Sequence, residues 1–280
     1  MERLGSMVLI SFQSNQSLLL QGERNRDYIA FCVEQTNAID MHRVWGEKIQ
    51  PHSIHGFSSR LSEAFFQTTP GSLISIALLP IARLKAIAER ESMGSFMETI
   101  EANNTAVLPD QQFTQIKTLL QPNNASKNPN AKSNSDLVEA LLVECFSHEG
   151  KHQPHAPSLT HRTELIRELI EFSFKQSTSP LSLHDICNII FTSPTTITVG
   201  CREMLGLGPM ALLKRIRLQQ VQHVLIDLDL QQRLGYSTVQ QIANHYGFQS
   251  RNHFARDYKL AFGLTPQQTL RRTKSLATIQ

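Results

Sequence analysis

Hydrophobic and polar residues alternate in three segments of the first 80 residues, as expected of β-strands. The segments are MVLISF at 7–12, YIAFCVEQ at 28–35 and GSLISIALLP at 71–80. In the second of them, Ile29, Phe31 and Val33 fall on one face of a strand. The pattern predicts antiparallel strands of a small sheet or a partial barrel.

The hydrophobic spacing changes to a helical period at Ile81. Leu84, Ile87 and Ala88 predict a helix that ends near Gly94. A second helix is predicted over 136–146, with Leu137, Leu141, Leu142 and Cys145 on one side. The segment between them, about 121–135, is rich in Asn, Pro, Ser and Lys and has almost no apolar residue. We therefore expect it to be a flexible loop.

A second polar segment, SHEGKHQPHAPS at 147–158, predicts a linker and a domain boundary. Residues 1–157 would then form a regulatory, sensing or dimerisation domain, and residues 158–280 a helical domain. The predicted fold class is α+β.

Capping signals divide the second domain into short helices. Ser182 and Asp185 have capping-box spacing, as do Thr238 and Gln241, and Ser193 precedes a proline. A long helix is predicted from Pro209 through Leu225, and an irregular interruption from 227 to 237. Two helix-turn-helix units result, at 182–205 and 238–262, joined by the long helix.

The final helix of the second unit has one apolar and one cationic side. Phe254, Tyr258 and Ala261 form the predicted packing face. The exposed arc is predicted to hold Arg251, Asn252, Ala255, Arg256 and Lys259. Arginine makes bidentate hydrogen bonds to guanine and asparagine makes them to adenine, so this arc fits base edges and phosphates in a major groove.

The corresponding helix of the first unit has fewer polar groups. Ile197, Cys201 and Met204 form its predicted core side. The outward side is predicted to comprise Thr195, Thr198, Val199 and Arg202. With one charged residue, this unit is expected to discriminate weakly by hydrogen bonding.

Residues of about 178–272 resemble the DNA-binding domain of the AraC/XylS family of transcriptional regulators. The resemblance rests on LSLHDIC, GLGPMALLKRIRL, VQQIANHYGFQSRNHFARDYKLAFGLTP and the following QQTLRR. It implies seven helices, with two helix-turn-helix units that address major-groove segments about one helical turn apart. The N-terminal part is only loosely similar to the cupin-like sensing domains of the family, mainly through TPGSLISIALLP.

By position, the resemblance assigns DNA contacts in both units. The base-reading residues are Thr195, Thr198, Val199, Arg251, Asn252, Ala255 and Arg256. The residues that anchor the DNA backbone are Ser193, Arg202, Lys214, Arg215, Arg217, Ser250 and Lys259. For Arg215 and Arg217, internal salt bridges to Asp227 or Asp257 remain an open alternative.

Two departures from the family pattern affect the geometry. Cys201 stands where the family usually has a bulky aromatic residue, and residues of about 231–237 form an insertion before the second unit. The insertion leaves the tilt between the units open. The resemblance implies double-stranded DNA and RNA polymerase as partners, and an activator. A small-molecule effector, a homodimer and repression are left open.

Charge supports the same interpretation. The net charge of +3 conceals −3 on residues 1–157 and +6 on residues 158–280, so a polyanion is attracted to the C-terminal part. The four widely spaced cysteines include no CxxC pair and predict reduced, buried thiols. We find no signal segment and no apolar run of membrane-spanning length, which predicts a cytoplasmic protein.

The alternative hypothesis is a cupin-like small-molecule-binding domain or metal-dependent enzyme with a helical scaffold. Its metal ligands would have to come from His42, Glu47, His52 and His55, whose spacing is poor. His148, His152 and His155 lie in the predicted linker and are expected to be solvated, and His253 is expected at the flank of the DNA-contacting helix. Without a phosphate loop, nucleophile elbow or carboxylate pair, we expect no enzyme activity, no metal and no cofactor.

Overall fold

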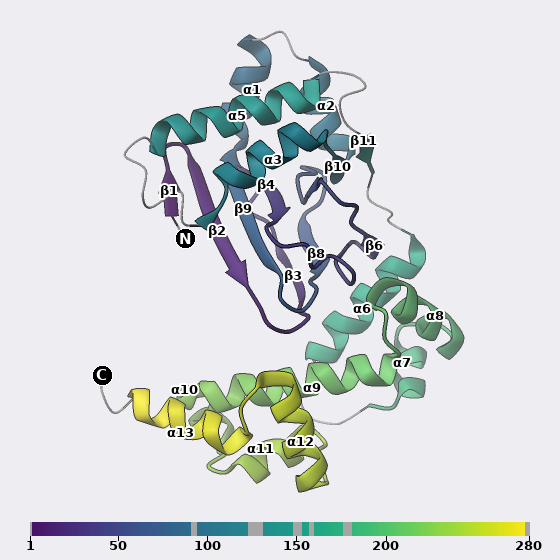
Figure 1. Cartoon of the computed structure of the whole chain (residues 1–280). Coiled ribbons are helices and arrows are strands. Elements are labelled where there is room, and N and C mark those ends of the chain that lie inside the picture. Colours follow the sequence, from purple (N-terminus) through teal and green to yellow (C-terminus); the bar gives the residue numbers. More distant parts are fainter. Residues whose placement is uncertain are drawn as a thin grey trace. The chain divides into compact units, whose positions relative to one another are not determined.

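The computed structural model divides the chain into two compact units, Met1–Leu159 and Thr160–Gln280 (Figure 1). It describes residues 2–90, 94–122, 131–147, 153–156, 160–175 and 181–277. Histidines 148 and 152 of the predicted linker lie outside the described residues. In the described part of the chain, every helix is too short or too polar to cross a membrane.

The first unit is built on two antiparallel sheets. Its strands are β1 (Glu2–Leu4), β2 (Met7–Gln13), β3 (Leu19–Glu23), β4 (Tyr28–Glu34), β5 (Arg43–Val44), β6 (Glu47–Lys48), β7 (Ser53–His55), β8 (Glu63–Gln67), β9 (Leu73–Pro80), β10 (Thr105–Val107) and β11 (Gln153–His155). One sheet has the order β1-β2-β9-β4-β7-β10-β11, and the other has the order β3-β8-β5-β6. The three predicted strands are confirmed as β2, β4 and β9. Most of the others are too short for alternation to reveal them.

Among its described residues, the first unit has four helices, which pack on one face of its larger sheet (Figure 1). They are α1 (Ile81–Arg90), α2 (Gly94–Ala102), α3 (Asp110–Leu119) and α5 (Ala131–Ser147). Ile29, Phe31 and Val33 of β4 are buried under these helices, as the alternation predicts. The hydrophobic effect of this sheet-on-helix core holds the unit together.

Helix α5 corrects two predictions. It begins at Ala131, inside the segment expected to be a loop, because extending an existing helix by a turn is far easier than nucleating one. Residues 123–130 of that segment lie outside the described residues. The core-facing stripe includes Val138, Leu142 and Cys145, whereas Leu137 is 48% exposed. The predicted stripe was therefore wrong by one position at its start.

The predicted linker at 147–158 is also not wholly irregular. Within it, β11 pairs with β10, so that His155 lies opposite Thr105. The backbone hydrogen bonds of an exposed sheet edge account for this addition, because a strand can join an edge whatever its side chains are.

The second unit is entirely helical in its described residues. Its helices are α6 (His161–Lys175), α7 (Leu183–Ile189), α8 (Pro194–Leu205), α9 (Pro209–Ile226), α10 (Leu228–Leu234), α11 (Val239–His245), α12 (Arg251–Phe262) and α13 (Pro266–Ala277). The long helix α9 contacts α6 and α8 as well as α11, α12 and α13. These observations confirm the predicted α+β class, with a sheet domain followed by helices in two helix-turn-helix units.

The irregular interruption predicted at 227–237 was wrong, because α10 occupies most of it. The Asp227 carboxylate accepts a hydrogen bond from the Leu230 backbone N–H at 2.8 Å, and Gly235 ends the helix in the left-handed conformation. A capped start and a glycine end are sufficient for a short helix that packs on α9. Pro266 begins the last helix, α13, at a position where a proline is readily accommodated.

Candidate nucleic-acid interface

The turn of the second helix-turn-helix unit is fixed by its caps. Thr238 and Gln241 exchange the two hydrogen bonds of a capping box at the start of α11. After α11, Gly247 adopts a φ of 80°, which residues with a Cβ rarely adopt. The next residue, Phe248, then packs against Phe254 with ring centroids 5.0 Å apart. This packing sets the direction in which α12 leaves the turn.

Aromatic side chains hold the inner face of α12. Phe254 and Tyr258 are buried, and the Tyr258 ring lies 4.6 Å from that of Phe262 between centroids. The Tyr258 hydroxyl donates to Thr269 Oγ1 of α13 at 3.2 Å. Ala261 is half-buried in the same cluster. The predicted packing face of α12 is confirmed.

The outer face of α12 begins with two side chains that have no internal partner. Arg251 and Asn252 are exposed, and neither side chain has a hydrogen bond or ion pair within the described part of the chain. The first turn of α12 contains no acidic residue, although a helix N-terminus carries partial positive charge. A cation there raises the local potential further, and a bound anion would lower the electrostatic energy.

The N-cap of α12 leaves a further polar group available. Ser250 is exposed and occupies the N-cap position, but its side chain makes no capping hydrogen bond. Its hydroxyl can therefore bond an external acceptor beside the first helical N–H groups.

The first helix-turn-helix unit is capped more completely. Ser182 and Asp185 form the predicted capping box of α7, and Ser193 Oγ accepts from the Thr196 N–H at the start of α8 at 3.0 Å. Ile197, Cys201 and Met204 are buried, which confirms the predicted core side of α8.

The outer face of α8 has little free hydrogen-bonding capacity. Thr195 and Arg202 are exposed, and Val199 is 37% exposed. The Thr198 hydroxyl donates to the Pro194 carbonyl at 2.7 Å, so only its methyl group and acceptor lone pairs face outward. This face presents mainly methyl groups and one guanidinium.

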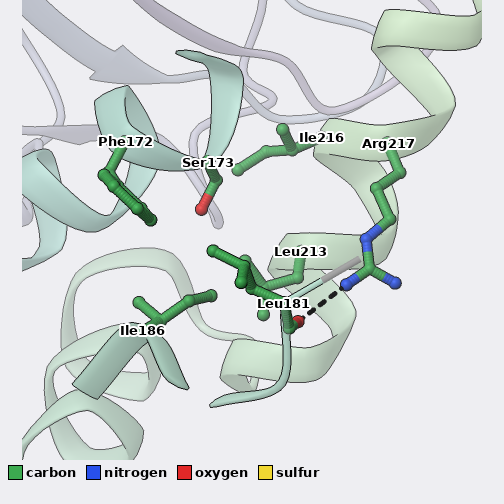
Figure 2. A pocket seen from close by; sticks show the side chains of 7 residues that line it. All are labelled: Phe172, Ser173, Leu181, Ile186, Leu213, Ile216 and Arg217. Atoms are coloured by element: carbon green, nitrogen blue, oxygen red, sulfur yellow. Dashed lines mark hydrogen bonds between the residues drawn. The ribbon is translucent and has the colours of Figure 1, made fainter. Parts of the chain in front are cut away.

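The cations of α9 differ in what they contact. Lys214 Nζ lies 3.0 Å from Asp257 Oδ2 and so joins α9 to α12. Arg217 points inward beside a small cavity of about 30 Å³ and donates to the Leu181 carbonyl at 3.0 Å (Figure 2). Burial lowers the pKa of Arg217. Arg215 is exposed.

The salt bridges left open for Arg215 and Arg217 do not form among the described residues. Lys214 already pairs with Asp257, while Asp227 is engaged as the cap of α10. Asp257 also lies 3.6 Å from the Nε of its neighbour Arg256.

Comparisons with known proteins agree with this geometry. A family described as a helix-turn-helix domain matches residues 186–272. A solved structure, described as that of a probable AraC family transcriptional regulator from Rhodopseudomonas palustris, is 30% identical in sequence. The match covers 39% of this chain and 97% of that one, with a TM-score of 0.35.

The chain belongs to the AraC family.

Two further relatives match different shares of this chain. The probable thc operon regulatory protein of Rhodococcus erythropolis is 29% identical over 152 residues, which are 51% of this chain and 44% of that protein. The chain thus spans less than half the length of this curated relative. ToxT from Vibrio cholerae is 13% identical, with 94% of this chain and 97% of that chain covered and a TM-score of 0.34. Residues 186–272 are thus a helix-turn-helix domain of the AraC type.

In this AraC-family chain, most of the predicted DNA-contacting residues lie at the surface of the C-terminal compact unit, Thr160–Gln280. The exposed ones are Ser193, Thr195, Val199, Arg202, Lys214, Arg215, Ser250, Arg251, Asn252, Arg256 and Lys259. Thr198, Ala255 and Arg217 are half-buried. His253 is exposed beside Arg251 and Asn252. The individual DNA contacts of these residues stay predictions.

The metal ligands of the alternative hypothesis are not gathered at one place. His42 and His55 are buried with ring centroids 5.0 Å apart, but His52 is 48% exposed beside Asp110 and Glu47 is exposed on β6. Among the described residues, no three His, Cys, Asp or Glu side chains are placed to hold a metal ion.

Glu34, which is buried beside His42, was not predicted as a site residue from the sequence. Their Oε2 and Nδ1 atoms lie 3.6 Å apart. Burial alone would raise the pKa of Glu34, but the nearby His42 ring and the hydrogen bonds from Ser72 and Thr36 outweigh it and lower the pKa to about 2. Burial also lowers the pKa of His55 well below its usual range. The signal was the alternation of β4, which places Glu34 opposite the Ile29 face.

Proposed function

We propose that the protein is a sequence-specific activator of transcription that reads two adjacent major-groove segments with α8 and α12. The N-terminal unit would control this activity. Support comes from the pair of equivalent helix-turn-helix units on α9 and from the cationic C-terminal unit, with a net charge of +6 over residues 158–280.

The observation that carries the proposal is the exposed, unpartnered start of α12. The side chains of Arg251 and Asn252 make no hydrogen bond or ion pair within the described chain, and they lie at a helix end that attracts anions. A merely solvated helix face would place acidic residues at this end instead.

The proposed roles follow the chemistry of each exposed side chain. On α12, Arg251 and Asn252 would bond base edges, Ala255 would allow close approach, and Arg256 would reach a base or a phosphate. Lys259 and Ser250 would bond phosphates.

On α8, Thr195, Thr198 and Val199 would contact thymine methyl groups or accept hydrogen bonds, because these side chains end in methyl groups and hydroxyls. Ser193, Arg202, Lys214 and Arg215 would anchor the DNA backbone. Arg217 would contribute only indirectly, because its guanidinium is bonded to Leu181.

Control by a small molecule would use a groove in the N-terminal unit. It has a volume of about 520 Å³, within the range of ligand sites, and is lined by residues of β4, β7, α3 and the loops beside them. Lys117, His52 and Gln50 supply polar groups at its wall, and Ile39, Ile49 and Phe113 supply apolar surface. As an activator, the bound protein would recruit RNA polymerase.

The test is selection of bound duplexes from a random DNA pool by the full chain. We expect two conserved half-sites about one helical turn apart, and affinity that falls steeply as salt concentration rises because phosphates release counterions. Recovery of a single half-site, or of no common sequence, would contradict the proposal.

Two arginine variants then separate base reading from backbone contact. We expect Arg251→Ala to weaken binding by ~1–3 kcal/mol and to relax the preference at one base pair. Arg202→Ala, the matched control on α8, should weaken all sequences alike and reduce the salt dependence by about one counterion. Identical sequence preferences for the two variants would count against the assigned roles.

A further inference from the structure

The turn of the first helix-turn-helix unit contains a residue that neither packing nor backbone conformation explains. Phe191 is 94% exposed and has a φ of 51°. A bulky residue with a Cβ is strained in this left-handed region, and an aromatic ring in water is unfavourable as well. Both features disfavour phenylalanine here.

The turn of the second helix-turn-helix unit shows which residue suits this backbone conformation. The Phe248 N–H donates to the Ala243 carbonyl, and the Thr192 N–H donates to the Cys187 carbonyl, both at 2.9 Å. Because the two bonds span the same number of residues, Phe191 occupies the position of Gly247. The second unit thus uses glycine where the first uses an exposed phenylalanine.

Phe191 also does not replace Phe248, which packs on Phe254 in the second unit. The residue equivalent to Phe248 is Thr192, which is half-buried. The Phe191 ring therefore adds nothing to the apolar contact that closes such a turn.

The position of Phe191 is continuous with the DNA-binding face. It lies two residues before Ser193, the N-cap of α8, and a helix-turn-helix unit directs this end of its second helix into the groove. The outer face of α8 is otherwise made of threonine and valine methyl groups, with few free donors. An apolar group beside it extends a surface that suits thymine methyl groups and deoxyribose.

We propose that Phe191 is a DNA-contacting, specificity-determining residue, whose ring packs against a thymine methyl group or a sugar at the groove edge beside α8. This proposal rests on the function proposed above. The first helix-turn-helix unit would thereby recognise its half-site largely by apolar contact. The strained backbone at Phe191 would be retained because DNA binding needs the aromatic ring.

The test compares folding and binding in the same variants of the full chain. Phe191→Gly removes both the strain and the ring. We expect its thermal midpoint, measured by calorimetry, to rise by about 2–6 °C, because the left-handed conformation suits glycine. We expect its affinity for the selected duplex, measured by fluorescence anisotropy, to fall about 3–20-fold through loss of an apolar base contact. The proposal therefore predicts that Phe191→Gly raises the thermal midpoint and weakens DNA binding at the same time.

Two further variants make the result specific. Phe191→Tyr keeps an aromatic ring and should retain affinity within about twofold, with its preference for the base at that position unchanged. Ile189→Ala removes a neighbouring side chain that is 44% exposed on α7, and it should change neither the midpoint nor the affinity by much.

Several results would overturn the proposal. Unchanged affinity of Phe191→Gly would exclude the DNA contact, and unchanged affinity with reduced transcription would assign the ring to a protein partner instead. A lower midpoint would show that the ring packs within the chain. If the wild-type chain selects no DNA sequence and Arg251→Ala has no effect, the proposed function fails together with this inference. If Arg251→Ala weakens binding and Phe191→Gly does not, only this inference fails.

Discussion

Counted from the N-cap serine, Cys201 of α8 stands at the same position as Tyr258 of α12, eight residues along the helix. Both side chains are fully buried. The thiol occupies much less volume than the phenol ring. In the first helix-turn-helix unit, close packing without a void therefore requires a shorter distance between α8 and its neighbouring helix. At Gly200, a Cβ would come within 3.0 Å of Ile166 in α6.

In the second helix-turn-helix unit, the position equivalent to Gly200 makes a polar contact with a neighbouring helix. Asp257 corresponds to Gly200 and forms its ion pair with Lys214 of α9. Helix α8 is therefore held by close contact at Gly200 and by an ion pair between Arg162 of α6 and Glu203, whereas α12 is held by an aromatic core and by the ion pair of Asp257 with Lys214 of α9. Equivalent backbones with different interiors should respond differently to the same kind of substitution.

The largest expected effect is at Tyr258. Tyr258→Ala should destabilise the C-terminal unit by about 3–5 kcal/mol, because it leaves a cavity between α12 and α13 and removes the hydrogen bond to Thr269. Urea unfolding followed by circular dichroism measures the loss. Leu260→Ala, on the same helix at 70% exposure, should stay within about 0.5 kcal/mol of wild type. Equal losses in the two variants would show that α12 does not pack through its aromatic face.

A smaller loss is expected at the contact between α6 and α8. Gly200→Ala places a Cβ 2.9 Å from Arg162 Cγ and 3.0 Å from Ile166, so side chains must shift. Overpacking costs ~1–3 kcal/mol and the helix preference of alanine returns about 1 kcal/mol, which leaves a net loss of up to about 2 kcal/mol in urea unfolding. Gly208→Ala has no atom within 4 Å and serves as the control. A more stable Gly200→Ala protein would refute the close contact.

The two N-cap serines should differ in their contribution to stability. Ser193→Ala removes a capping hydrogen bond and should cost about 1 kcal/mol of unfolding free energy. Ser250 makes no such bond, so Ser250→Ala should leave stability within about 0.5 kcal/mol while weakening affinity for the selected duplex severalfold. The pair is compared by urea unfolding and by anisotropy. Equal stability losses would mean that Ser250 also caps its helix.

The smallest expected effect is a pH dependence of local stability at α7, in the first helix-turn-helix unit. Hydrogen bonds from the Ser182 side chain and backbone lower the pKa of Asp185 below its usual range. A lowered native pKa stabilises the fold above the unfolded value of about 3.9, and this stability is lost as pH falls through the lower native value. The equivalent residue of the second unit is Gln241, which does not ionise.

Hydrogen exchange measured between pH 6 and pH 3 reports this difference. After correction for intrinsic rates, the α7 amides should lose protection below about pH 4 relative to the α11 amides. Asp185→Asn should remove the difference. Parallel loss of protection in α7 and α11 would show that the capping carboxylate has no such role.

Sequence patterns predicted the parts of the fold that depend on local signals. The caps at Ser182, Ser193 and Thr238 identified α7, α8 and α11, because an N-cap is decided within four residues. The alternation of β4 and β9 was readable because both strands are long. These signals were enough to locate both helix-turn-helix units.

The remaining features depend on contacts that a local pattern does not contain. Strand β11 exists because β10 offers an open edge, and α10 because α9 offers a surface. The partner of Asp257 was uncertain in sequence, since Lys214, Arg215 and Arg217 are close together on one helix. The unusual conformation of Phe191 appears only once its turn is compared with that at Gly247.

Helix α9 has a consequence for the operators that the protein can use. Leu213 and Ile216 belong to the part of α9 next to α7, and Val221 and Leu225 to the core shared with α11 and α12. One added residue between these sets would advance the second unit by about 1.5 Å and turn it by about 100°. If α8 and α12 read two DNA segments as proposed, the length of this single helix would set the permitted spacing of those segments. Lineages that alter this spacing would have to gain or lose whole helical turns.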